Sequence, residues 1–189
     1  MNKILEKKIL SREVVQMKLY APEIAEERQA GQFIIIQVDS DFTERIPLTI
    51  ADADPASGSI TIIFQIVGKS TLLLAQKNAG DYVENLLGPL GKPTHIEKVG
   101  TVVCVGGGIG VAPLHPIAQA FKNAGNKVII IMGARTKELI IFEEEMRKIA
   151  DELIICTDDG SYGRKCLVTE PLREVCAKGD ADLAVTIGP

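Results

Sequence analysis

The chain has 189 residues, of which 46% are hydrophobic, and its formal net charge is -4 at pH 7. This length and apolar content suffice for one large domain or two small ones with packed cores. The acidic balance gives no electrostatic reason to expect nucleic acid as a partner, and without a signal peptide or a long apolar stretch we expect a cytoplasmic protein with no membrane insertion.

Short β-type runs dominate the part of the chain before residue 98. The clearest runs are 33–38 and 60–67, with turn signals at 52–55 and 57–59 and one helix-like segment at 71–76. In the second run, apolar residues alternate with Thr61 and Gln65, which is typical of a strand buried on one face only. This half of the chain therefore predicts a small antiparallel β-barrel or sandwich.

After Lys98 strand-like and helix-like units alternate. Strands are predicted at 101–105, 127–132, 153–156 and 183–187, and helices at 114–124, 138–150 and 169–177. Pro113 in the first turn and Gly125 at the end support the first helix. Alternation of this kind implies right-handed crossovers and a parallel sheet covered on both faces. We therefore predict a β + α/β fold: an antiparallel β-barrel domain in 1–97 and a doubly wound parallel α/β domain in 98–189.

The segment Gly106 to Pro113 lies between the first strand and the first helix of that second half. Glycines there allow backbone N–H groups to approach a phosphate at a helix N-terminus. The segment is not the Rossmann fingerprint, because Val111 stands where the last glycine belongs and the second strand runs into Gly133-Ala134-Arg135 without an acid. A tight turn without a ligand is the alternative. The density of glycines followed by Ala-Pro favours dinucleotide binding.

Gly68-Lys69-Ser70-Thr71 is similar to the end of a P-loop. That motif requires an earlier glycine where Ile63 stands, so a kinase or ATPase is disfavoured. The same residues nevertheless offer backbone donors, two hydroxyls and a lysine at an expected helix N-terminus. This combination suits a pyrophosphate in a different fold.

The cysteines, at 104, 156, 166 and 176, form no C-x-x-C pair. Their spacing suits neither a zinc site nor a local iron–sulfur motif, so we predict no metal site. We interpret them as buried, reduced thiols and expect no disulfide in a cytoplasmic chain. His95 and His115 are interpreted as structural residues.

Five motifs together carry a family resemblance. They are Arg45-Ile46-Pro47-Leu48-Thr49, Gly68 to Thr71, Gly88-Pro89-Leu90-Gly91, Gly106 to Pro113 and Asp158-Asp159-Gly160-Ser161-Tyr162-Gly163. Their order resembles that of the ferredoxin-NADP reductase superfamily over nearly the whole chain. Within it, the chain is most similar to the small (alpha) flavoprotein subunits of NADH-dependent ferredoxin:NADP oxidoreductases, also called sulfide dehydrogenases, and is near the electron-transfer subunit of dihydroorotate dehydrogenase.

The resemblance implies an oxidoreductase whose barrel binds FAD and whose α/β domain binds NAD(P)H, with the nicotinamide meeting the flavin between them. Hydride would pass from NAD(P)H to FAD, and single electrons would then pass to an iron–sulfur acceptor. That acceptor would be ferredoxin or a larger partner subunit of the oxidoreductase. The cofactors carry this chemistry, so no protein general base is needed.

Roles for individual residues also follow from the resemblance. In the barrel, Arg45 would bind the FAD pyrophosphate, Thr49 would place its hydroxyl near flavin N5 as the catalytic residue, Pro47 and Leu48 would shape the isoalloxazine bed, and Gly68, Lys69, Ser70 and Thr71 would complete the phosphate site. In the α/β domain, Gly107, Gly108, Gly110 and Pro113 would form the pyrophosphate turn of the nicotinamide dinucleotide, with Arg135 and Asp158 nearer the adenosine end.

Simpler interpretations stay open beside these. Arg45 could pair with Glu44 or Asp41 on the surface, and Asp158-Asp159-Gly160 could be only a turn. The chain could also be a nucleotide- or flavin-binding subunit with no redox activity of its own. The presence of both the Arg45 motif and the glycine turn favours the oxidoreductase over such a binding subunit, which needs only one ligand site. Asp158 near the ribose would repel a 2'-phosphate that Arg135 could attract, and we expect NAD(H) rather than NADP(H).

The same resemblance sets expectations for the end of the chain. Relatives continue past Pro189 into a segment that supports the nicotinamide site and a cysteine cluster that holds a [2Fe-2S] centre. We therefore expect this nucleotide domain to be truncated at its C-terminus and the chain to bind FAD but no cluster. Cys166 stands where these relatives carry glycine.

Overall fold

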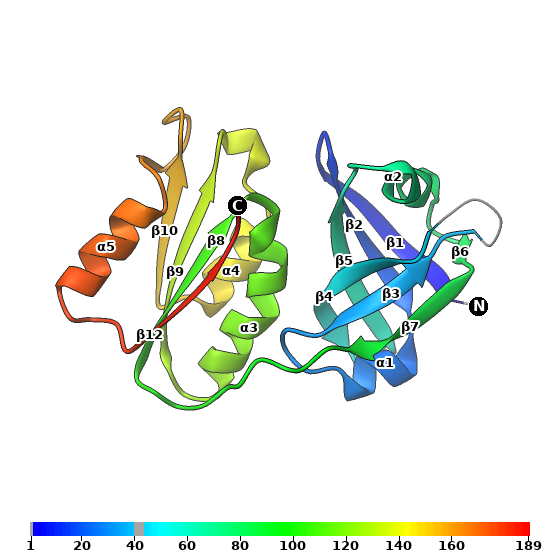
Figure 1. Cartoon of the computed structure of the whole chain (residues 1–189), viewed down its shortest axis with the longest axis horizontal. Helices are drawn as coiled ribbons and strands as arrows, with labels where there is room; N and C mark the ends of the chain where they lie inside the picture. The colour runs from blue at the N-terminus through cyan, green and yellow to red at the C-terminus, as the bar shows by residue number, and fades with distance from the viewer. Residues whose placement is uncertain (1, 40–43) are drawn as a thin grey trace. The chain divides into compact units, whose positions relative to one another are not determined.

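The computed structural model describes residues 2–39 and 44–189. The chain divides into two compact units, residues 1–94 and 95–189 (Figure 1). Each unit has its own sheet and its own hydrophobic core. The strands pair antiparallel in the first unit and parallel in the second.

The first unit is a nearly closed antiparallel barrel. Its elements are β1 (Asn2–Ser11), β2 (Val14–Tyr20), α1 (Pro22–Glu27), β3 (Phe33–Gln37), β4 (Ile46–Asp54), β5 (Ser59–Gln65), α2 (Lys69–Gln76), β6 (Tyr82–Val83) and β7 (Asn85–Leu90). The strands form one seven-stranded sheet in the order β6-β1-β2-β5-β4-β3-β7. Every described pairing in it is antiparallel, which confirms the predicted class of this half.

The barrel is filled by the inward residues of its strands. In β3 the side chains of Ile34 and Ile36 are fully buried, and their partly exposed neighbours point the other way, because successive strand residues face opposite sides. Leu74 of α2 joins the same core. The helix begins at Lys69, two residues earlier than predicted, with Gly68 as its N-cap.

Two details of this half were predicted wrongly. Residues 52–54 lie in β4, and the turn occupies 55–58, where Asp54 Oδ2 accepts a hydrogen bond of 2.6 Å from the Ser57 hydroxyl. Strand β5 is buried on both faces, since Thr61 and Ile63 are only 7% and 6% exposed. It is an interior strand between β2 and β4, and helix α1 also contacts it. Sequence alternation alone does not show such coverage.

The second unit is a parallel α/β sheet. Its elements are β8 (Thr101–Gly107), the 3-10 turn η1 (Gly108–Gly110), α3 (Val111–Asn123), β9 (Lys127–Ala134), the 3-10 turn η2 (Lys137–Leu139), α4 (Glu143–Ile149), β10 (Glu152–Thr157), β11 (Arg164–Lys165), α5 (Thr169–Ala177) and β12 (Leu183–Ile187). The five strands run in the order β11-β10-β9-β8-β12, and all described pairings are parallel.

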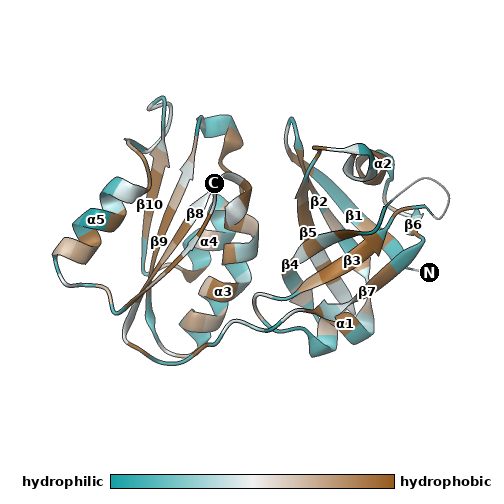
Figure 2. Cartoon of the chain, in the orientation of Figure 1, coloured by the Kyte–Doolittle hydropathy of each residue, from teal (hydrophilic) through white to brown (hydrophobic). Residues whose placement is uncertain are grey.

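Helices cover both faces of this sheet, as the doubly wound prediction requires. On one face Val103, Ile129 and Val175 pack together, which places α5 over β8 and β9. Helices α3 and α4 contact the strands as well and lie on the other side of the sheet from α5 in Figure 1. Figure 2 shows the central strands as largely hydrophobic and the outer part of α5 as hydrophilic. The central strands β8 and β9 are therefore buried on both sides.

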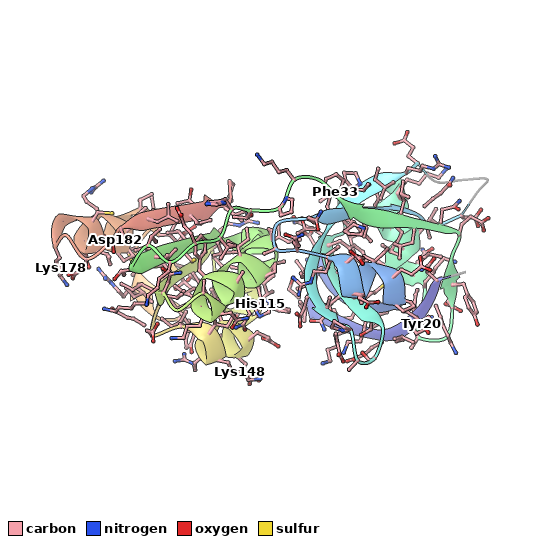
Figure 3. The ribbon with its side chains drawn as sticks, turned by 90° about the horizontal axis from the view of Figure 1, so that it is seen from below. Tyr20, Phe33, His115, Lys148, Lys178 and Asp182 are labelled. Atoms are coloured by element: carbon pink, nitrogen blue, oxygen red, sulfur yellow. The ribbon has the colours of Figure 1, made fainter. Side chains whose placement is uncertain are left out.

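The helix predicted at 138–150 is wrong in its first half. Residues 137–139 form a 3-10 turn, and the α-helix starts only at Glu143. Phe142 interrupts the helical path with a φ of 60°, and its ring packs edge-on against His115 of α3 at 5.1 Å between centroids. Burial of Ile141 and Phe142 side by side requires this break. Figure 3 labels His115 on α3.

Side chains from loops fix the edge at which the parallel strands begin. Asn126 is buried, and its Oδ1 accepts hydrogen bonds from the backbone N–H groups of Val99 (2.8 Å) and Gly100 (3.0 Å). Its Nδ2 donates to the carbonyls of Glu97 (3.0 Å) and Phe121 (2.9 Å). Asn126 therefore links residues 97–100, which precede β8, to the last turns of α3.

We predict that Asn126→Ala lowers the free energy of unfolding by about 2–4 kcal/mol, because it removes four hydrogen bonds and leaves buried backbone groups without partners. Denaturant unfolding followed by circular dichroism measures this loss. Asn123→Ala is the matched control, since Asn123 is exposed and should change stability by less than about 0.5 kcal/mol. Equal effects of the two substitutions would contradict the assignment.

Asp151 holds the same edge through its carboxylate. Its Oδ2 accepts from the Val128 N–H at 2.8 Å, and its Oδ1 pairs with Lys122 Nζ at 2.6 Å. The hydrogen bond from Lys122 and that from the backbone lower the pKa of Asp151. A carboxyl whose pKa is lower in the folded protein stabilises the fold above its unfolded pKa, near 4, and loses that contribution as the pH falls through the folded value.

We therefore expect the melting temperature of Asp151→Asn to lie below that of the wild type at pH 7. The difference should shrink as the pH is lowered below about 4. Thermal melts from pH 7 to pH 3 test this, with Glu152→Gln as the neighbouring exposed control. A difference that is constant with pH would show that the carboxylate charge contributes nothing.

Candidate functional site

The carboxyl ends of the parallel strands form one edge of the second unit. In register, Gly106 of β8 lies between Met132 of β9 and Ile187 of β12, and Gly107 pairs with Gly133. Strand β10 ends beside β9 at Thr157. The loops that follow these strands must therefore meet at the same edge, which is where open α/β sheets bind ligands.

The glycine turn leads from β8 into α3 at this edge. Gly108 has a φ of 55° and no atom lies near the position of an added Cβ, so its backbone is open to an approaching group. A Cβ on Gly110 would collide with the carbonyl of Ile187. Glycine is thus needed at one position for conformation and at the other for close packing. Helix α3 begins directly afterwards at Val111, with Pro113 in its first turn.

Arg135 and Asp158 are brought together beside that turn. The N–H of Asp158 donates to the carbonyl of Ala134 at 3.1 Å, and that of Asp159 donates to the carbonyl of Arg135 at 3.2 Å. Both side chains are exposed. Arg135 and Asp158 thus place a cation and an anion on adjoining loops at the carboxyl edge.

The loop after β10 is held by its own side chains. Asp159 Oδ1 accepts from the hydroxyl of Ser161 at 2.6 Å and from its N–H at 2.9 Å, and these bonds lower the pKa of Asp159. Thr157 Oγ1 donates to the Tyr162 carbonyl at 2.7 Å and accepts from its N–H at 3.0 Å. The interpretation of residues 158–160 as a turn is thus correct for the backbone conformation. The side chain of Asp158 takes no part in these hydrogen bonds.

Sequence reasoning missed three residues around this loop. The phenol of Tyr162 donates to Glu143 Oε1 at 2.9 Å, and the ammonium of Lys137 lies 5.2 Å from the centre of the Tyr162 ring. A hydrogen bond from Arg147, and a weaker contribution from Tyr162, lower the pKa of Glu143. The break before α4 places Glu143 at a helix start, and no periodicity in the sequence shows that break.

In the barrel the motif at 45–49 enters strand β4. Thr49 pairs in register with Phe33 of β3, and Pro47 pairs with Ile35. Arg45 precedes the strand and is exposed, while Leu48 and Thr49 are partly buried. Glu44 is described, whereas Asp41, the other suggested surface partner of Arg45, lies outside the described residues.

The second barrel motif forms the start of α2. Thr71 Oγ1 accepts from the N–H groups of Val67 (3.1 Å) and Gly68 (3.0 Å) and donates to the Gly68 carbonyl at 3.0 Å. The Thr71 hydroxyl therefore bonds with the backbone at the N-terminus of α2. Gly68 and Lys69 are exposed there, and within residues 2–39 and 44–189 no atom lies near the position of a Cβ on Gly68.

A pocket of about 380 Å³ lies beside α2 in the described part of the barrel. It is lined by Val38, Asp39, Lys69, Leu73, Gln76, Lys77 and Asp81. The pocket therefore brings the end of β3 next to Lys69, one of the predicted phosphate-binding residues. Its walls combine apolar side chains with charges of both signs.

No three His, Cys, Asp or Glu side chains gather as a candidate metal site among residues 2–39 and 44–189. No helix in that part of the chain is long and apolar enough to cross a bilayer.

The cysteines are not all buried, contrary to the expectation from sequence. Cys104 and Cys156 are buried within β8 and β10, Cys166 is partly exposed, and Cys176 on α5 is exposed. The sulfur atoms of Cys156 and Cys166 lie 3.0 Å apart. Thiols distant in the sequence are thus brought together by the fold.

Comparison with known proteins gives the family. No family model matches the chain. Over its full length it is 39% identical to a protein of Thermotoga maritima described as a homolog of the dihydroorotate dehydrogenase B (NAD(+)) electron transfer subunit, of which it covers 66%. It is 34% identical to the dihydroorotate dehydrogenase B (NAD(+)) electron transfer subunit of Desulforamulus reducens, with 92% of this chain and 69% of that one covered.

A solved structure of an NADH-dependent reduced ferredoxin-NADP oxidoreductase superimposes with a TM-score of 0.93 at 38% identity, over 100% of this chain and 68% of that one. The chain spans about two thirds of the length of these relatives. An antiparallel barrel followed by a parallel α/β sheet matches the two-part ferredoxin reductase fold. The chain therefore belongs to the family of dihydroorotate dehydrogenase B electron transfer subunits, within the ferredoxin reductase-like flavoprotein oxidoreductases.

Proposed function

We propose that this chain binds FAD on its barrel and NADH on its α/β unit, and that it passes electrons from NADH to an iron–sulfur acceptor such as ferredoxin or a larger partner subunit. The observation that carries the proposal is the carboxyl edge of the parallel sheet. There the glycine turn at the start of α3 and the charged pair Arg135 and Asp158 come together. The names of the relatives, which are electron transfer subunits and an NADH-dependent oxidoreductase, support it.

At that edge the chain's own groups suit a dinucleotide. The open backbone at Gly107 and Gly108 and the N-terminus of α3 present N–H groups and a positive dipole end to a pyrophosphate. Pro113 lies in the first turn of α3, where a backbone N–H would have no partner within the helix. Its missing N–H therefore costs the helix no hydrogen bond, and its fixed φ favours the helix start. Arg135 and Asp158 would then contact the adenosine end.

The barrel residues fit a second phosphate group. The exposed start of α2 offers the backbone of Gly68, Lys69 and Ser70, whereas the hydroxyl of Thr71 shapes the turn instead. Arg45 would supply a bidentate charge-assisted contact, and Pro47, Leu48 and Thr49 would line the ring on β4. FAD, when bound, would supply the change from two-electron to one-electron transfer.

We infer a preference for NADH over NADPH. Asp158 is held at the edge by its backbone bond to Ala134, so its carboxylate stays near the expected ribose and would repel a 2'-phosphate. The names of several relatives specify NAD(+) or NADH. The exposed Arg135 is the residue that would counteract this preference.

Visible absorption spectra test the proposal. The full chain is mixed with FAD, desalted, and then treated anaerobically with NADPH and separately with NADH. We expect retained flavin bands that NADH bleaches faster than NADPH does. Retained bands that neither nucleotide bleaches would favour the alternative, a binding subunit without redox activity of its own. Loss of all flavin on desalting would contradict the proposal for the barrel.

Arg45→Gln should weaken FAD binding by about 10- to 100-fold, because one charge-assisted contact to a phosphate contributes roughly 1.5–3 kcal/mol. Fluorescence titration with FAD measures the affinity. Arg12→Gln is the matched control, since Arg12 is an exposed arginine of the same unit that lies in the turn between β1 and β2. If both variants bind FAD like the wild type, Arg45 has only a surface role.

A further inference from the structure

Cys156 and Cys166 form a thiol pair that the proposed electron transfer does not use. Cys156 is the fifth residue of β10, and Cys166 follows the two-residue strand β11, which pairs in parallel with β10. Their sulfurs are 3.0 Å apart, whereas a disulfide bond measures about 2.05 Å. The two sulfurs would therefore have to approach by about 1 Å to form the bond.

The two thiols differ in accessibility. Cys156 is 1% exposed, and burial raises its pKa to about 12, with its contact to Cys166 acting in the same direction. Cys166 is partly exposed. A small oxidant from solvent therefore reaches Cys166 first, and Cys156 is placed to resolve the oxidised sulfur.

We propose that Cys156 and Cys166 are a reversible redox site that closes to an intramolecular disulfide on exposure to peroxide. The Cys166 thiolate attacks the peroxide oxygen and becomes a sulfenic acid, and the departing hydroxide takes up a proton to give water. The Cys156 sulfur then displaces the hydroxyl group from Cys166, forming the S–S bond and a second water. Two thiols lose two electrons and hydrogen peroxide gains two; a dithiol reductant reverses the change by exchange.

The position of the pair connects it to the carboxyl edge of the sheet. Residues 157–165 lie between the two cysteines and include the loop that carries Asp158. That loop is tied to β9 through the bonds of Asp158 and Asp159 to neighbouring carbonyls. A disulfide would close both ends of this loop and restrict it. Resting on the function proposed above, the disulfide should make NADH binding tighter, because less ordering remains to be completed on binding.

The covalent part is tested on the full chain without any nucleotide. The reduced protein is exposed to a slight molar excess of hydrogen peroxide, and its intact mass and tryptic peptides are compared before and after. We expect a loss of about 2 Da for the two hydrogens removed. Cleavage after Arg164 and Lys165 separates the two cysteines, so only a disulfide keeps their peptides together.

Two variants make the assignment specific. Cys166→Ser should abolish the mass loss, and Cys176→Ser, which removes an exposed cysteine on α5, should retain it. The peptide map of the wild type provides the same test if Cys166→Ser does not fold. Retention of all four thiols, or a disulfide that involves Cys176, would overturn the proposal.

The effect on binding is tested by titrating NADH into the reduced and the oxidised protein. We expect the oxidised form to bind about 3- to 10-fold more tightly, with the reduced affinity restored by a dithiol. Equal affinities with a mapped disulfide would overturn the link to the nucleotide site. If neither form binds NADH, the proposed function fails while the disulfide site stands on its own mass measurement.

Discussion

Close backbone packing at the carboxyl edge of the parallel sheet is the constraint on which the second unit depends. Gly110 has no room for a Cβ because the Ile187 carbonyl of β12 occupies that space, and Gly133 has none because Val168 lies against it. Glycine therefore lets the start of α3 pack against the end of β12, and the end of β9 pack against the start of α5. Since α3 starts from this packed turn, its N-terminus is fixed at the edge and is directed to the same place as the neighbouring loops.

The loop after β10 links three properties of this edge. Its conformation is set internally, by Thr157 on Tyr162 and by Ser161 on Asp159. Its position is set by backbone bonds to the end of β9. Its two ends carry Cys156 and Cys166 at a distance that a disulfide nearly matches. One short segment therefore connects the proposed nucleotide contact with the proposed redox site.

The parallel half was predictable because each element has its own hydrophobic run between turn residues. Helix α5 at 169–177 and strand β12 at 183–187 have the bounds that the sequence predicted. The break at Phe142 was not predictable, since it depends on a contact with His115, far away in the sequence. The thiol pair was missed for a related reason: no motif has this spacing, and β11 is too short for a periodicity signal.

In the barrel, the sequence predicted where α2 lies but not the use of its polar groups. Thr71 was expected at a phosphate, yet its hydroxyl makes three hydrogen bonds with the turn itself. A hydroxyl engaged in this way stabilises the helix start, and the backbone of the exposed Gly68 and Lys69 is left to meet a ligand. The sequence motifs predict a phosphate site here, and only the hydrogen bonds show that the Thr71 hydroxyl is used within the turn.

The electrostatic balance at the proposed adenosine site also follows from which charged groups are fixed. Asp159 is engaged by Ser161, whereas the backbone of Asp158 is held to Ala134, so its short side chain places the carboxylate within a small volume. Arg135 is exposed on a long side chain and must lose rotamer freedom to bind a phosphate. The fixed Asp158 carboxylate would repel a 2'-phosphate as soon as the nucleotide binds. The mobile Arg135 guanidinium would attract that phosphate only after its side chain has become ordered. This difference supports the proposed preference for a nucleotide without a 2'-phosphate.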